Sequence, residues 1–359
     1  CCKYHKRFKG FIPGQERMRT STSLIFLTAW SLINAAAAES SSDLQKLADT
    51  GHCTKCDLAG ADLSGMRLMS ADLSGSNLRG ATLRKTVLFR ANLSSVDLRD
   101  ARVEKASLGR VNLSGAQLGG LELQGARLAH ATLVDARLEN ADLSGAMLEH
   151  TDLRGANLVG ANLSNSSLRN AKLDGAVLDD INFKSADLRL LDLRKIASLR
   201  DSDLSAARLD KVKLDGLDLS GNRFDKASLQ QASLAGANLQ KASLVGTNLR
   251  RTNLKEADFT GADLRRANMK GAKMQGVLLG SANLEQSQLA GNLIGSDFSN
   301  GTLAKADLSG ANLKDALFRN ADLRQANFTS CNLYGADFSG AKLKQATFRR
   351  ANLRNATFE

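Results

Sequence analysis

Two cysteines three residues apart are the first candidates for chemistry. Cys53 and Cys56 form a Cys-x-x-Cys sequence. In an exported protein such a pair most simply forms a local disulfide. Free thiols, a redox pair and a metal site are the alternatives, but a thioredoxin-like pair needs a βαβ setting that this sequence lacks. Zinc needs two further ligands, and only His52 lies nearby. We therefore expect a structural disulfide, with no cofactor and no metal.

Two histidines form the second candidate. His130 and His150 lie twenty residues apart. In a chain whose structure repeats every twenty residues, their imidazoles would be neighbours that could share a metal ion or titrate together. A pair without a fixed third ligand is a weak site. The alternative is that both are solvated surface residues.

Charge is distributed unevenly along the chain. The whole sequence carries 49 Lys and Arg against 37 Asp and Glu, a net charge of +12. Residues 135–192 are net acidic, whereas 241–275 and 314–359 are net basic. The candidate polyanion-binding residues are Arg250, Arg251, Lys255, Arg265, Arg266, Lys270 and Lys273. They would suit anionic polysaccharide or a membrane surface. Nucleic acid fits less well, because its readers usually interleave aromatic residues with the cations.

Motifs of known enzyme classes are missing. The sequence contains no Gly-x-Ser-x-Gly, no P-loop and no dinucleotide fingerprint. With one Pro, one Trp and 4% aromatic residues, it also lacks the large side chains that fill an ordinary globular core. At 43% hydrophobic residues it is too apolar to be disordered. We expect a non-catalytic, repetitive structure.

A five-residue period places these candidates in space. An apolar residue, usually Leu, recurs every five residues from Leu58 to Leu193. The pattern resumes one residue late at Leu199, and one residue early at Leu293, and it continues to Phe358. Ala is common two places before each central residue, Asp or Asn one place before it, and Gly two places after it.

Neither a helix nor a strand keeps every fifth residue on one face. A chain that turns about 90° every five residues does so, and four repeats then close one coil of twenty residues. The central residues and the Ala positions would point inward, while the others point outward. Stacking at the ~4.8 Å spacing of β-strands predicts fifteen coils and a rod of roughly 70 Å. Cys331 takes an inward Ala position and is expected to be a buried free thiol.

The repeat resembles the A(D/N)LxX consensus of the pentapeptide-repeat family, for example in Ala-Asp-Leu-Ser-Gly at 61–65 and 306–310. This resemblance covers residues 58–358 and implies an all-β fold, a right-handed quadrilateral β-helix. Some family members are similar in size and charge to B-form DNA and protect or inhibit DNA gyrase. Such mimicry needs an acidic surface and a cytoplasmic address, so a gyrase modulator ranks last among our functional alternatives.

Both ends of such a solenoid expose unpaired backbone. Residues 42–49 have the spacing of a short helix that would cap the N-terminal end, and 39–55 are assigned to this cap and the Cys-x-x-Cys linker, with the solenoid at 56–359. Phenylalanines concentrate in the last coils. We expect Phe338, Phe348 and Phe358 to fill the lumen there and to offer an end for association into a homodimer.

The N-terminal segment is typical of a secretory signal peptide. Met18 and Arg19 precede an apolar stretch at 24–33, and Ala36 to Ala38 provide a small-residue cleavage site. A single anchoring or buried helix is the alternative. We assign 18–38 to the signal peptide and 1–17 to an upstream segment. We expect cleavage near Ala38 and a periplasmic or secreted scaffold or interaction rod with an unknown protein partner, and we keep a polyanion- or envelope-binding protein as the alternative.

Overall fold

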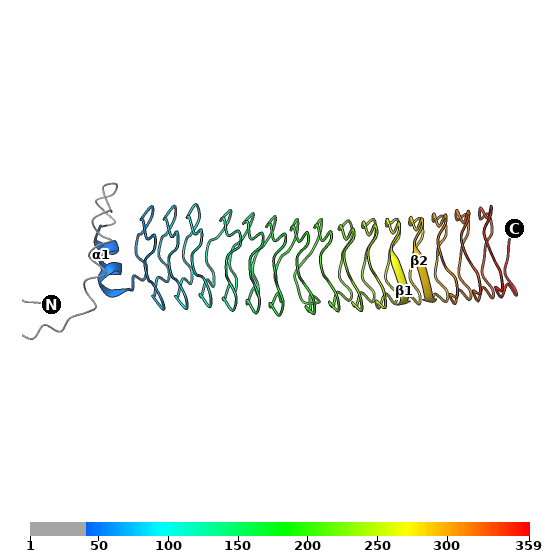
Figure 1. Ribbon diagram of the computed structural model, residues 1–359, viewed down its shortest axis with the longest axis horizontal. Coiled ribbons are helices and arrows are strands. Elements are labelled where there is room, and N and C mark those ends of the chain that lie inside the picture. Colours follow the sequence, from blue (N-terminus) through cyan, green and yellow to red (C-terminus); the bar gives the residue numbers. More distant parts are fainter. Residues whose placement is uncertain (1–40) are drawn as a thin grey trace, which may run out of the picture. The chain divides into compact units, whose positions relative to one another are not determined.

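The computed structural model describes residues 41–359, so the predicted upstream segment and signal peptide lie outside the described residues. The described chain contains one helix, α1 (Ser41–Thr50), and two strands, β1 (Asn268–Lys273) and β2 (Gln288–Asn292). Nearly all other residues belong to short coils joined by single parallel bridges. These coils follow one another along one axis in chain order (Figure 1).

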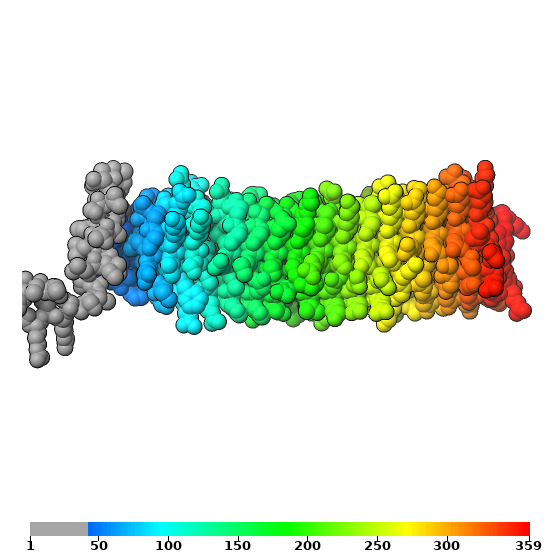
Figure 2. Space-filling view, viewed as in Figure 1, coloured from blue at the N-terminus to red at the C-terminus, as the bar shows by residue number. Residues whose placement is uncertain are grey.

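Each bridge joins residues about twenty apart, as the five-residue period predicts. Asp57 pairs with Asn77, Asp62 with Thr82, and the same step recurs to the last coil. We name the four sides of the solenoid after their first central residues: the Leu58, Leu63, Leu68 and Leu73 sides. Residues at one position of one side therefore form a column along the axis. The stacked coils leave no visible break along the face drawn in Figure 2.

The local sequence explains each corner. The amide of Ala61 donates to the carbonyl of Leu58 at 3.1 Å, which closes a four-residue turn. Gly60, the third residue of that turn, has a φ of 67°, as a type II turn requires. Between coils, the amide of Leu58 donates to the carbonyl of Asn77 at 2.8 Å. Each pentapeptide therefore satisfies its backbone hydrogen-bonding groups by one turn within the coil and by hydrogen bonds to the neighbouring coils.

The Asp or Asn before each central residue also has a structural role. The carboxamide oxygen of Asn92 accepts from the backbone amide of Ser94 at 3.2 Å and from the side-chain Nδ2 of Asn112 at 3.0 Å. The first bond holds the corner in the way an Asx turn does, and the second joins adjacent coils. Such residues point outward, but their side chains are used in hydrogen bonds that stabilise the fold.

The inward positions form a continuous apolar core. The central residues and the Ala positions are buried along almost the whole rod, and Phe183, Phe224 and Phe259 are fully buried. Their removal from water provides the main stabilisation, at about 25 cal/mol per Å² of apolar surface. Because each coil contacts only its neighbours, stability is distributed along the axis.

The two shifts in the period have distinct structural consequences. Val177 pairs with Ser198, so the inserted residue near Ile196 is absorbed within one coil. The missing residue near 287–290 coincides with β1 and β2, which pair in parallel with a bulge between Lys270 and Ala272. Both irregularities lie where the sequence predicts them.

The helix α1 packs on the first coil. Leu47 is buried, and Leu44 contacts the core from a partly buried position. The carboxylate of Asp43 accepts a 2.8 Å hydrogen bond from the amide of Asp57. Gly51, with a φ of 72°, donates its amide to the carbonyl of Leu47 and ends the helix.

Candidate functional site

Cys53 and Cys56 are joined by a disulfide, and both side chains are buried. Cys53 already pairs with the next coil, since its amide donates to the carbonyl of Asp72 at 2.7 Å. The first coil hydrogen bonds thus begin ahead of the boundary we predicted at residue 56. The hydroxyl of Ser76 donates to the carbonyl of Cys53 at 2.6 Å and links the disulfide to the ladder.

Metal binding at this disulfide is disfavoured by the bonding around it. Asp43, Cys53 and Cys56 place possible ligand atoms within 4.8 Å of one another. However, the sulfurs are bonded to each other, and the Asp43 carboxylate accepts from the amide of Asp57. His52 accepts a 3.0 Å hydrogen bond from the amide of Asp72 through Nδ1. Thiolates, which zinc would require, are not present.

His130 and His150 stack face to face on neighbouring coils. Their ring centroids lie 4.8 Å apart and the planes differ by 1°. Imidazole lone pairs lie in the ring plane, so two parallel rings do not direct them at one point. Among the described residues, no group of three potential ligands includes either histidine. Their place at a solvated corner, with φ near 60°, matches the alternative that we kept for this pair.

The seven basic candidates are spread over three sides. Arg250, Arg251 and Lys270 share the Leu68 side; Lys255 and Lys273 lie on the Leu73 side; Arg265 and Arg266 lie on the Leu63 side. Several have partners. Arg265 forms a salt bridge of 2.6 Å with Asp263, and Lys255 one of 3.2 Å with Glu256. The structure therefore brings three of the seven together and not the whole set.

The carboxylate of Asp263 shows what such pairing does. Burial opposes its ionisation, but hydrogen bonds from Arg265 lower the pKa of Asp263 below its usual value. The same motif, Asp followed two places later by Arg, recurs at Asp322 and Arg324, where the side-chain hydrogen bond from Arg324 lowers the pKa of Asp322. These arginines are therefore less available to an external anion than their sequence cluster indicates.

Phenylalanines fill the C-terminal coils as two perpendicular stacks. Phe298, Phe318, Phe338 and Phe358 stack on the Leu58 side with centroids 4.9–5.0 Å apart. Phe328 and Phe348 stack at 5.0 Å on the Leu68 side and meet the first stack edge to face. Phe338 is buried, Phe348 is partly buried and Phe358 is 46% exposed. Association through this end stays a prediction.

Cys331 is a buried free thiol, as its inward position predicts. Its side chain lies 2.9 Å from the carbonyl oxygen of Leu308. Burial raises the pKa of Cys331 to about 11. A thiol of this kind is a poor nucleophile at neutral pH, so Cys331 is a packing residue.

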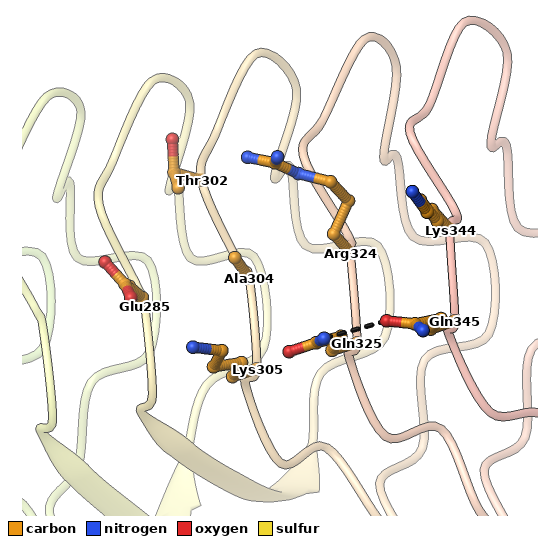
Figure 3. Close-up of a pocket in the computed structure, with 8 residues that line it drawn as sticks. All are labelled: Glu285, Thr302, Ala304, Lys305, Arg324, Gln325, Lys344 and Gln345. Atoms are coloured by element: carbon orange, nitrogen blue, oxygen red, sulfur yellow. Dashed lines mark hydrogen bonds between the residues drawn. The ribbon is translucent and has the colours of Figure 1, made fainter.

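A shallow groove of about 400 Å³ lies on the Leu63 side of the C-terminal coils. Its lining residues are Glu285, Thr302, Ala304, Lys305, Arg324, Gln325, Lys344 and Gln345 (Figure 3). The groove exists because Ala304 is short where neighbouring coils carry Glu285 and Arg324. The groove was not predicted from the sequence, although one Ala in a column of long polar residues was the available signal.

This groove offers polar contacts to a ligand. The amide nitrogen of Gln325 donates to the oxygen of Gln345 at 2.8 Å, as the dashed line in Figure 3 marks. Arg324 is held by Asp322 at 2.6 Å. The other lining groups are the Glu285 carboxylate, the Thr302 hydroxyl and the ammonium groups of Lys305 and Lys344. The groove can therefore contact a polar ligand.

Within residues 41–359, no helix is both long and apolar enough to cross a membrane.

Family models identify the class of protein. The pentapeptide-repeat model matches in eight copies within 52–84, 86–128, 122–160, 161–196, 202–240 and 232–271. A pentapeptide-repeat region model matches residues 290–358. The matches cover more than half of the chain, so this protein belongs to the pentapeptide-repeat family. No curated protein sequence matches it significantly.

Solved structures of pentapeptide-repeat proteins are also similar to this chain. HetL, involved in heterocyst differentiation regulation in the cyanobacterium Nostoc, is 26% identical and covers 88% of this chain and 95% of its own, with a TM-score of 0.20. QnrB1, a plasmid-mediated fluoroquinolone resistance protein, is 18% identical over 58% of this chain and 88% of its own, with a TM-score of 0.28. A thylakoid-lumen protein of Arabidopsis thaliana is 24% identical over 37% of this chain and 70% of its own, with a TM-score of 0.18.

Proposed function

We propose that this protein is a non-catalytic interaction rod that presents its flat sides to a protein partner. The observation that carries the proposal is that the five positions of each repeat have separate structural roles. Inward residues are used for packing and the Asp or Asn column for holding the coils together. The two residues after each central position are left to face outward. Function then resides in which outward side chains line up along a side.

The direct test is crosslinking in the native cell followed by mass spectrometry of the crosslinked peptides. The proposal expects crosslinks from one or two sides of the rod to one partner protein. Crosslinks scattered evenly over all four sides, or none to any protein, would contradict it.

We further propose that the rod is right-handed, has about fifteen coils and is capped by α1. In this proposal it is exported after cleavage near Ala38. The Cys53–Cys56 disulfide supports export, because disulfides persist in oxidising compartments. Cell fractionation with N-terminal sequencing tests it. Export predicts a mature chain that starts at Glu39 in the periplasm or medium, whereas an intact cytoplasmic chain would refute it.

Polyanion binding is the second candidate function. Arg250, Arg251 and Lys270 lie on one side, and no carboxylate forms a salt bridge with them within the described residues. Replacing Arg250 and Arg251 with Ser should then lower retention on heparin and on anionic vesicles. The paired Arg265 and Arg324 provide matched controls for loss of charge elsewhere. Unchanged elution of the double variant would exclude this surface.

Modulation of DNA gyrase is the third candidate, and it rests on the family resemblance alone. The net charge of +12 is opposite in sign to that of DNA. Inhibition of gyrase in a supercoiling assay by a stoichiometric amount of this protein would make gyrase modulation the leading candidate function.

A further inference from the structure

An apolar strip lies outward on the Leu68 side of the first coils. There the residue that follows the central leucine is Met69, Phe89, Gly109 and Ala129 in successive coils. Met69 is 59% exposed and Met147, farther along the same side, is 46% exposed. The N-terminal apolar strip, as we call it, consists of Met69, Val87, Phe89, Gly109 and Ala129.

The fold does not require apolar residues at these places. In the same coils, the corresponding positions on the Leu63 side are Ser64, Arg84, Glu104 and Gln124. On the Leu73 side, Ser occupies this position in three successive coils. Outward positions therefore accept polar side chains readily. A contiguous apolar strip leaves apolar surface exposed to water. A partner that covers this surface lowers the free energy of the system.

The ring of Phe89 packs against the next coil at Gly109. A Cβ added at Gly109 would lie 3.2 Å from the ring carbon Cδ2 of Phe89, so the ring covers the glycine. The guanidinium carbon of Arg90 lies 5.3 Å from the ring centroid. The ring, Gly109 and the Arg90 guanidinium thus lie together at the surface of adjacent coils, where an extended chain could contact them.

Cations border this strip without counter-ions. Arg67 and Arg127 lie on the strip side, and Arg90 and Arg110 lie at its corner. Within residues 41–359, none of the four takes part in a salt bridge. Across the four coils with central residues 68, 88, 108 and 128 this side carries no carboxylate, and the first is Glu149.

We propose that the N-terminal apolar strip binds an extended acidic segment of a partner protein. Apolar side chains of the segment would lie on Phe89 and Met69, while its carboxylates pair with the bordering arginines. Four coils at ~4.8 Å offer room for about five extended residues. This inference rests on the proposed interaction function and specifies its surface and the chemistry of its partner.

A second copy of this chain is a poorer occupant. Four of the ten carboxylates at 135–192 already have salt-bridge partners, such as Asp152 with Arg154 at 2.7 Å and Asp192 with Arg194 at 2.6 Å. Ion pairs would have to break before those carboxylates met the strip.

The test uses the full chain and a fluorescent twelve-residue peptide in which Asp or Glu alternates with Leu or Phe. We expect binding that weakens with salt. Met69→Ser with Phe89→Ser should lower the affinity about tenfold or more, because buried aromatic anchors dominate such interfaces. Arg90→Glu with Arg110→Glu should lower it to a similar extent. Matched controls on the opposite Leu58 side, Leu278→Ser and Arg137→Glu, should leave it unchanged.

Three outcomes would overturn the inference. They are no binding of the peptide at about 1 mM, equal losses in the controls, and strip-dependent binding of phosphatidylglycerol vesicles or of a second copy in place of the peptide. The native-cell crosslinks separate this inference from the proposed function. If strip variants keep every crosslinked partner, the inference fails and the rod proposal stands. If the wild-type chain crosslinks to none, the rod proposal itself fails.

Discussion

At the scale of single residues, the corner of each repeat carries the backbone strain. The second residue after a central position has a positive φ throughout the solenoid except at Lys195, beside the inserted residue, and this holds even where it is His130, His150 or Leu190. A non-glycine residue in this region costs about 1–2 kcal/mol. Gly at these corners therefore relieves strain, while the other residues are tolerated because coil stacking holds the backbone in place.

Gly291 is the corner where substitution should cost most. Its φ is 140°, and an added Cβ would lie 2.8 Å from the carbonyl oxygen of Ala272. We expect Gly291→Ala to destabilise the fold by about 1–3 kcal/mol more than Gly60→Ala, whose added Cβ meets nothing within 4 Å. Urea unfolding followed by circular dichroism measures the difference. Equal free energies of unfolding for the two variants would show that the coil relaxes around the lost residue.

At the scale of elements, the helix and the coils stabilise each other through few contacts. Leu47 provides the buried contact of α1, and Asp43 adds one hydrogen bond to the first coil. A ten-residue helix is marginal alone. Its order must therefore come from this packing.

Replacing Leu47 with Ala should detach α1 while the distant coils stay folded. Loss of a buried Leu costs about 2–5 kcal/mol, and a solenoid confines that loss to neighbouring coils. Hydrogen exchange should accelerate in α1 and in the first coil, with protection unchanged beyond Leu193. Leu44→Ala, at a partly buried position, is the milder control. Uniform acceleration along the rod would mean that the solenoid unfolds as a single unit.

At the scale of the whole molecule, repeated carboxylates make stability depend on pH. Hydrogen bonds from Ser339 lower the pKa of Asp337, and those from Arg194 lower that of Asp192. Side-chain hydrogen bonds from Arg99 and Arg154 likewise lower the pKa values of Asp97 and Asp152. Because such hydrogen-bonded Asp residues recur along the solenoid, their titration affects the stability of many coils and not of one site.

We expect the free energy of unfolding to be constant near neutral pH and to fall below about pH 4. A carboxyl whose folded pKa is depressed stabilises the fold above its unfolded pKa of about 3.9. That stabilisation is lost as the pH falls toward the folded pKa. Urea titrations between pH 7 and pH 2 measure it, and Asp192→Asn should flatten part of the slope. A stability that rises on acidification would contradict the argument.

Removal of one whole coil should preserve the rod. Deleting residues 229–248 removes twenty residues and brings Ser228 next to Leu249, so each column keeps its register. We expect an unchanged circular dichroism spectrum per residue and a somewhat lower free energy of unfolding. Deleting 229–250 removes two residues more, shifts the inward positions at the junction and should destabilise the coils around it far more than the in-register deletion. Equal free energies of unfolding for the two deletions would refute the view that the period sets the core.

The sequence by itself determined the solenoid, because the five-residue period sorts inward from outward residues without long-range information. It also located both shifts in the period and the burial of Cys331. Only the tertiary structure decided which outward residues share a surface. Sequence clustering united Arg250 with Arg265, yet each five residues move the chain to another side. Met69, Phe89 and Arg110 are scattered in sequence but lie on one side, because coil stacking joins residues twenty apart.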